Sequence, residues 1–408
     1  MIRIIIGAAA FLAIIDPAAA QAVKEPGRPD RVQISPILEV RARYEAVDQG
    51  ALDADALTLR LRGGAEARLG RFSLLAEGEA TVAPADGYNA FPFPLPGNDQ
   101  WRPDHSVIAD PENFELNRLQ LQYKSDSASL TLGRQRINLD DQRWVGSVGW
   151  RQNEQTFDAV RGEARLGPLA ADLTYATSQR SIFGEDAGPR TALDGDFIFA
   201  GLSSKLGPLQ GKLFGYILDY EEPFFLANSS TTYGGILSGS LPLGGARKLA
   251  VRASYARQSD HGGNPFDYAA DYWSFEGGTK IAGFDVAAGW ERLGSDQGRA
   301  VQTPMATLHK FNGWADLFLT TPPAGLEDAY LTVSRTFEQV KLVRALNAAI
   351  AFHQFDSAKG DVEYGTEWDA SLGFKLGKVG MLLKYADYDA KDFGTDTRKL
   401  WLQAEWVF

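Results

Sequence analysis

The chain has 408 residues, with 41 Lys and Arg against 52 Asp and Glu and a formal net charge of −11. Cysteine is absent, which excludes disulfide scaffolds, thiolate zinc sites, Fe–S clusters and cysteine nucleophiles. The acidic balance disfavours nucleic acid as a partner, and four histidines offer little for a metal site, so we expect no cofactor and no metal. A mean hydropathy of −0.22 excludes a bundle of membrane helices but allows a membrane β-barrel, whose strands alternate polar and apolar residues.

The first residues have the pattern of a secretory signal peptide. Arg3 precedes an apolar run over 4–15, and small residues at 18–22 fit a cleavage site. The apolar run is too short to cross a bilayer comfortably, which disfavours an N-terminal anchor helix. The predicted organisation is a signal peptide over 1–22, a periplasmic lead-in over 23–36 and a single β-barrel domain over 37–408.

Alternation of apolar and polar residues dominates the rest of the chain. Over 57–62, leucine at each odd position alternates with Thr58, Arg60 and Arg62. A helix would place Arg60 on the same face as Leu57, so the pattern indicates a strand with one apolar and one charged face. The apolar faces mix Leu and Val with many Ala, Gly and aromatic residues, while the opposite faces carry dense charge of both signs. This combination favours a membrane barrel over a soluble β-sandwich.

Segments of about 9–11 residues, the length of a tilted membrane strand, recur along the chain. They predict an all-β fold, a transmembrane antiparallel β-barrel of about 18 strands, with about 16 as the alternative. The expected strands lie near 37–46, 56–68, 71–81, 114–124, 128–137, 156–166, 169–180, 196–205, 209–220, 231–242, 247–258, 268–279, 283–293, 325–335, 344–355, 364–375, 380–388 and 397–408.

The connections alternate between short and long, as periplasmic turns and extracellular loops of such barrels do. Segment 82–113 is too rich in proline to be a strand, so we expect it to cover the barrel mouth or fold into it. The alternation of apolar and polar residues is interrupted near 325–345, where we expect an extended turn at 336–343 under the pore. The expected long loops are 82–113, 138–155, 181–195, 221–230, 259–267, 294–324 and 389–396.

Three segments resemble the alginate-export family of outer-membrane barrels. They are 133–159, which begins GRQRINLDDQRWVG; 303–316, which reads TPMATLHKFNGWAD; and 383–390, which reads LKYADYDA. The first two blocks are specific, and the resemblance extends over most of the predicted mature chain. It implies an eighteen-stranded channel that passes anionic polysaccharide or related solutes through an arginine-lined constriction.

Arginine is concentrated in the first half of the chain, since residues 31–165 contain fifteen Arg and one Lys. A guanidinium binds carboxylates bidentately, and basic rings lining a pore give anion selectivity. Strand alternation and the 133–159 block together give the candidate pore-lining, substrate-binding residues. They are Arg41, Arg43, Arg60, Arg62, Arg118, Arg134, Arg136, Arg143, Arg151 and Arg161. The alternative is that these arginines pair with luminal glutamates to make a neutral, rigid wall.

Arg134 is an exception within this set. Its position in the alternation places it with Leu130 and Leu132, toward lipid. An arginine at the bilayer midplane costs about 2–4 kcal/mol. A β-bulge at Gly133, or an exit of the chain from the membrane there, would resolve this, and we expect the bulge.

These features predict a passive outer-membrane channel, or porin, of a Gram-negative bacterium. It would pass anionic solutes, such as uronate polysaccharide or oligosaccharide or small organic acids, by diffusion or export. Outer-membrane lipid and lipopolysaccharide are expected partners. The barrel-assembly machinery is another, because Phe408 ends an alternating strand in a way that resembles the assembly signal of such barrels.

Two other functions remain open at this point. One is an outer-membrane lipid or glycan hydrolase with a loop site near His309 or Asp140. The chain has no GxSxG, HExxH or Walker pattern to support it. Asp140 and Asp141 are adjacent and so point apart on a strand, which favours a polar loop contacting arginines over a carboxylate pair or calcium site. The other is a closed adhesion or structural barrel.

Overall fold

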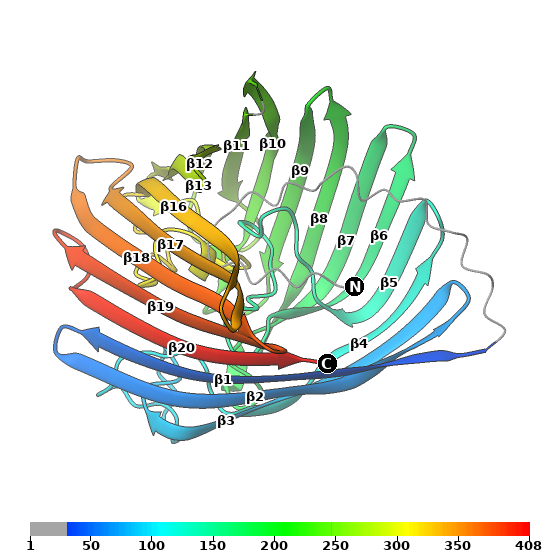
Figure 1. The fold of residues 1–408 in the computed structure, drawn as a ribbon, viewed down its shortest axis with the longest axis horizontal. Helices are drawn as coiled ribbons and strands as arrows, with labels where there is room; N and C mark the ends of the chain where they lie inside the picture. The colour runs from blue at the N-terminus through cyan, green and yellow to red at the C-terminus, as the bar shows by residue number, and fades with distance from the viewer. Residues whose placement is uncertain (1–30, 246) are drawn as a thin grey trace.

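The computed structural model of the protein describes residues 31–245 and 247–408. The predicted signal peptide, 1–22, and most of the predicted lead-in lie outside these residues, so both stay predictions. Eighteen strands form one antiparallel sheet, and it closes on itself because β1 pairs with both β2 and β20 (Figure 1). The prediction of an all-β, eighteen-stranded antiparallel barrel is confirmed.

Each expected strand corresponds to one strand of the barrel. The first nine are β1 (Gln33–Gln49), β2 (Leu52–Leu69), β3 (Phe72–Gly87), β4 (Asn113–Lys124), β5 (Ala128–Gln135), β6 (Thr156–Leu166), β7 (Leu169–Arg180), β8 (Ala192–Leu206) and β9 (Leu209–Tyr220). The others are β10 (Ser230–Gly244), β11 (Arg247–Asp260), β12 (Ala269–Ile281), β13 (Phe284–Leu293), β16 (Leu326–Val340), β17 (Val343–Asp356), β18 (Glu363–Leu376), β19 (Val379–Ala390) and β20 (Thr397–Val407).

The remaining elements are small and lie in the loops. They are a hairpin of β14 (Ser295–Asp296) and β15 (Arg299–Ala300) and the 3₁₀ helices η2 (Gly188–Arg190), η3 (Leu226–Asn228) and η4 (Leu308–Lys310). In the part of the chain that the structure describes, no helix has the length and apolarity that a bilayer crossing requires.

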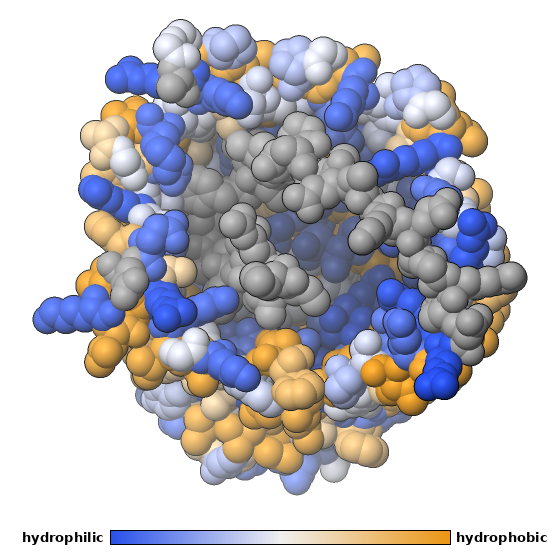
Figure 2. Space-filling model, turned by 45° about the vertical axis from the view of Figure 1, so that its right-hand side comes forward, coloured by the Kyte–Doolittle hydropathy of each residue, from blue (hydrophilic) through white to orange (hydrophobic). Residues whose placement is uncertain are grey.

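The two faces of the wall differ as the alternation predicts. On β2 the side chains of Leu57, Leu59 and Leu61 lie outside with 36–47% of their surface exposed. The side chains that alternate with these leucines, Thr58, Arg60 and Arg62, are buried inside with 1–2% of their surface exposed. Figure 2 shows hydrophilic side chains within the hollow of the barrel and hydrophobic side chains over much of its outside. The inner face is therefore charged on β2, while on β8 and β9 it carries a buried apolar cluster that includes Phe197, Phe199 and Phe214.

The barrel closes where its first and last strands meet. β1 pairs with β20 in a continuous register from Glu39–Val407 to Gln49–Thr397. The Phe408 amide extends this seam by donating to the Leu38 carbonyl at 2.9 Å. The Phe408 side chain is 69% exposed, so it contributes little packing to the finished barrel.

The long connections gather at one end of the barrel and the short turns at the other (Figure 1). Several strands run further into the long-loop end than expected, and β3 reaches Gly87 before the β3–β4 loop (88–112) begins. That loop packs Phe91 and Ile108, both at 0% exposure, against Val47 on the inner side of β1. The expectation that this proline-rich segment folds into the mouth is confirmed.

The expected extended turn near 336–343 is wrong. β16 and β17 remain paired down to Val340 and Val343, which leaves only Lys341 and Leu342 as a tight turn. The alternation seemed broken in the sequence because the charged Arg335 stands in the outward row of β16 between Leu331 and Phe337, although the ladder itself continues. A second correction concerns Gly133, where the pairing of β5 with both neighbours runs without a bulge.

The outward face of the wall makes a stability prediction. Leu61 lies near the middle of β2 and Leu69 at its short-turn end, and both are exposed in the outward row. Leu61→Arg should lower the free energy of unfolding by about 2–4 kcal/mol, because it places a charge at mid-depth in hydrocarbon, and Leu69→Arg by about 0–1 kcal/mol. Denaturant unfolding in phospholipid vesicles measures both. Equal losses for the two variants would contradict the assignment of this face to lipid.

Candidate functional site

Two loops fold from the long-loop end into the lumen and join there. The β5–β6 loop (136–155) and the β13–β16 loop (294–325) meet in a parallel bridge between Val145 and Met305. Backbone bonds fix the contact: the Gly146 amide donates to the Met305 carbonyl at 2.9 Å, and the Thr307 amide donates to the Gln142 carbonyl at 3.1 Å. The two loops therefore act as one body, which we call the constriction.

The tip of the β5–β6 loop reaches the opposite wall. The Asp140 carboxylate lies 2.7 Å from Lys212 on β9, and the Asp141 carboxylate lies 2.8 Å from Arg252 on β11. These contacts confirm the interpretation of Asp140 and Asp141 as a polar loop segment that pairs with basic side chains. Among the residues that the structure describes, no cluster of three acidic, His or Cys side chains is arranged to hold a metal ion.

Arginines of β1 hold the other end of the same loop. The Arg41 Nη1 atom lies 3.2 Å from each of the carbonyl oxygens of Gly149, Trp150 and Arg151. Arg43 donates to the Trp150 carbonyl at 2.5 Å, and its guanidinium carbon lies 4.1 Å from the centre of the Trp150 ring. These predicted pore-lining arginines therefore serve as anchors, because backbone carbonyls occupy their N–H groups.

A chain of alternating charges links this anchor to β3 and β4. Arg62 contacts Glu154 at 2.6 Å, and Arg136 bridges Glu154 and Glu77. Arg118 binds Glu77 with two hydrogen bonds of 2.8 and 2.6 Å. Burial alone would raise the pKa of Glu154, but Arg62 and Arg136 outweigh it and lower the pKa to about 2. Glu154 therefore stays ionised and holds the base of the β5–β6 loop to the wall.

Arg143 and Arg151 bind the two loops to each other and to the wall. Arg143 lies 2.9 Å from Glu291 on β13. Arg151 lies 3.3 Å from Glu45 on β1 and 3.0 Å from Asp316 on the β13–β16 loop. Burial disfavours the charged form of Arg151, but these carboxylates more than offset it and raise its pKa. Both arginines are structural ties within the constriction.

Arg60 and Arg161 lie on the inner face of the wall and pair with carboxylates of the strands. Arg60 lies between Glu39 and Glu405, at 3.2 and 3.1 Å. Arg161 contacts Asp172 on β7 and lies 3.1 Å from Glu163. Every arginine of the predicted set therefore has a carboxylate partner. This is what the alternative prediction, a neutral wall of paired arginines and carboxylates, requires.

Arg134 stays on the outside of the wall, in the phase that the alternation gives it. It is paired there with Asp158, which accepts two hydrogen bonds of 2.8 and 2.9 Å, and it also donates to the Leu116 carbonyl. An ion pair, rather than the expected bulge at Gly133, compensates the charge. The φ of Gly133 is +109°, and a side chain at this position would meet the Leu119 carbonyl, so glycine is required.

Exposure divides the inward arginines into two groups. The side chains of Arg136, Arg161 and Arg118 remain 24, 18 and 15% exposed, while the anchors within the constriction are at 9% or less. The predicted set therefore combines arginines that reach luminal water with arginines buried in the constriction.

An aromatic cluster fixes the constriction to β19 and β20, and no motif in the sequence indicates it. The Lys384 ammonium lies 3.7 Å from the Trp314 ring centre and 4.3 Å from the Trp150 ring centre. His309 stacks on Trp150 at 4.3 Å, and its ring nitrogens lie 2.8 Å from Asp316 and 2.5 Å from Lys384. These cation–π contacts bind both loops to β19.

The arrangement around His309 does not support the alternative of a hydrolase. A histidine base activates a nucleophile within hydrogen-bond reach. The ring nitrogens of His309 instead face the Asp316 carboxylate and the Lys384 ammonium, and the side chain is buried at 6% exposure. His309 therefore has a structural position within the constriction.

A carboxylate pair on β18 is a second feature that the sequence analysis missed. Glu367 accepts hydrogen bonds from the backbone amides of Trp314 and Ala315 at 2.5 and 2.8 Å. Asp369, two residues along the same inner face, is 1% exposed. Strand alternation over 364–375 places both side chains inside, but only the fold shows that the β13–β16 loop covers them. Glu367 therefore holds the β13–β16 loop against β18, and the loop screens this carboxylate pair from the lumen.

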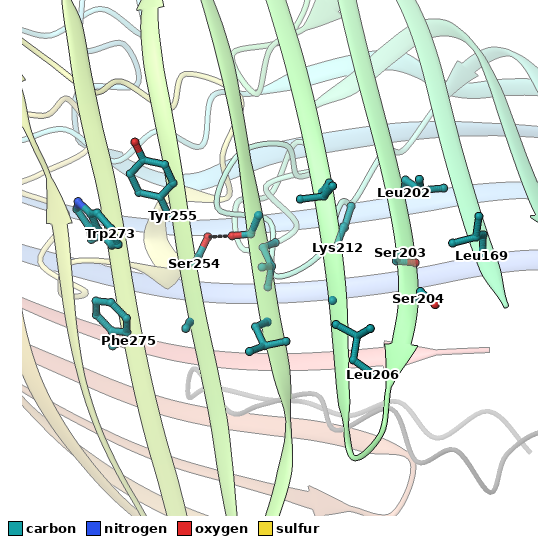
Figure 3. A pocket seen from close by; sticks show the side chains of 16 residues that line it. Leu169, Leu202, Ser203, Ser204, Leu206, Lys212, Ser254, Tyr255, Trp273 and Phe275 are labelled. Carbon is teal, nitrogen blue, oxygen red and sulfur yellow. Dashed lines mark hydrogen bonds between the residues drawn. The ribbon is translucent and has the colours of Figure 1, made fainter.

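An apolar hollow lies outside the barrel. Figure 3 shows Leu202, Leu206, Tyr255, Trp273 and Phe275 around a cavity of about 580 Å³ on the strands from β8 to β12. These side chains belong to the outward, apolar row of the wall. The hollow is thus a feature of the lipid-facing surface, and the candidate site is the constriction.

Comparison with known proteins agrees with this architecture. Residues 40–205 match the family model described as alginate export, which includes the 133–159 block and excludes the blocks at 303–316 and 383–390. The predicted resemblance is confirmed for this part of the chain, a shorter stretch than expected. The curated proteins contain no significant match to the chain.

Solved structures share the whole barrel. Acinetobacter baumannii OccAB4 is 14% identical, with 92% of this chain and 98% of that one covered at a TM-score of 0.72. Pseudomonas aeruginosa OpdK, solved with vanillate, is 14% identical, with 92% of this chain and 98% of that one covered at a TM-score of 0.69. Pseudomonas aeruginosa OccK9 (OpdG) is 16% identical, with 92% of this chain and 99% of that one covered at a TM-score of 0.70. The chain therefore has the fold of these outer-membrane proteins.

The buried histidine predicts an acid-sensitive constriction. Burial lowers the pKa of His309 to about 3, helped by Lys384 and Arg151 and opposed by Asp316. If the loop is released, His309 regains an ordinary pKa near 6.5, so the released state takes up a proton that the closed state excludes. Asp316 is held well below its usual pKa and stays ionised in the closed state. Lowering the pH from about 6.5 toward 4 should therefore favour release.

Single-channel conductance recorded from pH 7 to pH 4 measures this effect. We expect the wild-type conductance to rise on acidification and His309→Asn to lose much of the rise, since asparagine does not titrate. Charged groups around His309 come from both loops and from β19 and β20, namely Arg151, Asp316, Lys384 and Lys399. The same pH profile in wild type and variant would contradict the role given to His309.

Proposed function

We propose that the protein is a passive outer-membrane channel for anionic solutes, either uronate saccharides or small organic acids. The observation that carries this proposal is the closed barrel, whose inner face carries paired charges from β2 to β7 and which is narrowed by two inward loops. Such a barrel encloses a water-filled path whose width and charge are set by the constriction. No chemical step is involved, because solutes move down their own gradient.

The water-accessible arginines give the proposed preference for anions. Arg118, Arg136 and Arg161 line the lumen beside the constriction and keep part of their guanidinium groups exposed. A guanidinium stays charged at any relevant pH and matches the geometry of a carboxylate.

The similar proteins support the same class of solute. The family model that matches 40–205 is described as alginate export, and alginate is an anionic polysaccharide. OpdK was solved with vanillate, which is an aromatic carboxylate. Both compounds carry the carboxylate that an arginine fork recognises. We therefore propose the carboxylate, rather than a particular backbone, as the recognised group.

The proposal also sets the orientation in the membrane. The end with long loops faces the outside of a Gram-negative cell, in contact with lipopolysaccharide, and the short turns face the periplasm. The signal peptide over 1–22 would direct export across the inner membrane. Phe408, exposed at the end of the closing strand, is available to the barrel-assembly machinery during insertion.

Reversal potential across a planar bilayer in a potassium chloride gradient tests the proposal. We expect chloride to be preferred over potassium. Arg118→Gln and Arg136→Gln together should lower this preference about twofold or more, because they remove two accessible cations and leave Glu77 unbalanced. Arg257→Gln on the outer face, which removes the same charge at a position away from the lumen, is the matched control.

Two results would count against the proposal. Absence of conductance from a folded barrel would indicate a closed structural role. A preference for potassium in the wild type would contradict the solute class while leaving the barrel intact.

A further inference from the structure

Arg190 has unusual surroundings at the rim of the barrel. It ends η2 in the β7–β8 loop (181–191), and its guanidinium carbon lies 4.7 Å from the ring centre of Phe93 and 4.6 Å from that of Phe224. Phe93 belongs to the β3–β4 loop and Phe224 to the β9–β10 loop (221–229). The guanidinium therefore lies where three loops of the long-loop end converge.

The guanidinium nitrogens of Arg190 have no partner among the described residues. Within residues 31–245 and 247–408, its guanidinium neither donates a hydrogen bond nor lies within 4.0 Å of a carboxylate. Burial lowers its pKa, and no neighbouring charge contributes to the shift. This contrasts with the lumen, where each predicted pore-lining arginine has a carboxylate partner. A half-buried cation without polar partners requires an explanation.

Two other rim arginines show that this is not a general property of the loops. Arg102, on the β3–β4 loop, lies 2.6 Å from the Asp86 carboxylate. Arg299, on β15, also lies over a phenylalanine ring, but it donates to the carbonyl oxygen of Ala227 and the side chain of Asn228. Aromatic contact at the rim is thus compatible with hydrogen bonding of the guanidinium, which Arg190 lacks.

The aromatic contacts also prepare Arg190 for a ligand. Rings over a guanidinium hold its plane through cation–π attraction and restrict its rotamers, while the N–H groups remain at the edge. A planar fork held in this way loses little entropy when it binds a carboxylate bidentately. Hydrogen bonds between charged groups are stronger than neutral ones, which suits brief capture of an anion at a mouth.

We propose that Arg190 is a docking site at the long-loop mouth for the carboxylate of the transported solute. The inference rests on the proposed function and adds a first contact outside the constriction. A uronate or organic acid arriving from the long-loop side would bind the guanidinium edge before it reaches the β5–β6 loop. The alternative is that Arg190 only fastens three loops together by its contacts with Phe93 and Phe224.

Sided current blockade distinguishes these roles. The probe is a mannuronate trimer, with mannotriose as its uncharged counterpart, applied to one side of a single channel at a time. Arg190→Gln should lower the rate of blockade from the long-loop side about tenfold, as expected for losing a charge-assisted hydrogen bond. The rate from the short-turn side should be unchanged. Arg190→Lys, which keeps the charge and loses the fork, should fall between wild type and Arg190→Gln.

The chain itself supplies the controls. Arg102→Gln removes the same charge from a paired rim arginine and should leave both rates unchanged. The chain has no cysteine, so Asp99→Cys on the exposed β3–β4 loop marks the long-loop side by reaction with an impermeant thiol reagent. Heat-dependent gel migration checks that each variant is folded.

The outcomes separate this inference from the proposed function. If the wild type conducts but the trimer never blocks it, the solute class of the proposed function fails, and Arg190 with it. If the trimer blocks wild type and Arg190→Gln equally from the long-loop side, only the docking role of Arg190 is wrong. Equal losses from both sides would show that Arg190 acts through loop structure, which also overturns the docking role.

Discussion

A bilayer offers no hydrogen-bond partner to the backbone, so every peptide group in the wall must be paired within the wall. This protein meets the constraint by joining β1 to β20, which leaves the sheet without an edge. Closure also fixes the side chains, because each strand must then present one row to hydrocarbon and the other to an enclosed interior. The dense charge of Arg60 and Arg62 is tolerated only because that interior exists.

The enclosed charges then determine how the loops are held. A buried arginine is costly unless it is paired, and the constriction supplies carbonyl and carboxylate oxygens where β1 and β2 supply guanidinium groups. Arg41 and Arg43 on backbone oxygens and Arg62 on Glu154 are examples of this exchange. The interactions that neutralise the buried arginines of the wall therefore also position the loops. Only a minority of the arginines remain accessible to a solute. Channel width and channel charge consequently depend on the same contacts.

The sequence predicted the strands well because the period of two is set by the lipid and extends over the whole chain. It predicted the inward side of Arg118 and Arg161 for the same reason. It could not predict the partners of these residues, since Arg151 meets Asp316 across 165 positions in the sequence. Lys384 among three indoles gave no local signal either. The tight turn after Val340 was missed because its strand ends extend beyond the apolar band, where alternation no longer reports on pairing.

The central claim is that two inward loops, and not the barrel wall, set the size of the passage. Single-channel conductance of the wild type and of a variant in which residues 138–153 are replaced by a short Gly-Ser linker tests this most directly. The account predicts a conductance several-fold larger in the variant, because an eighteen-stranded wall encloses far more space than the closed constriction leaves. Equal conductance in two correctly folded proteins would contradict it.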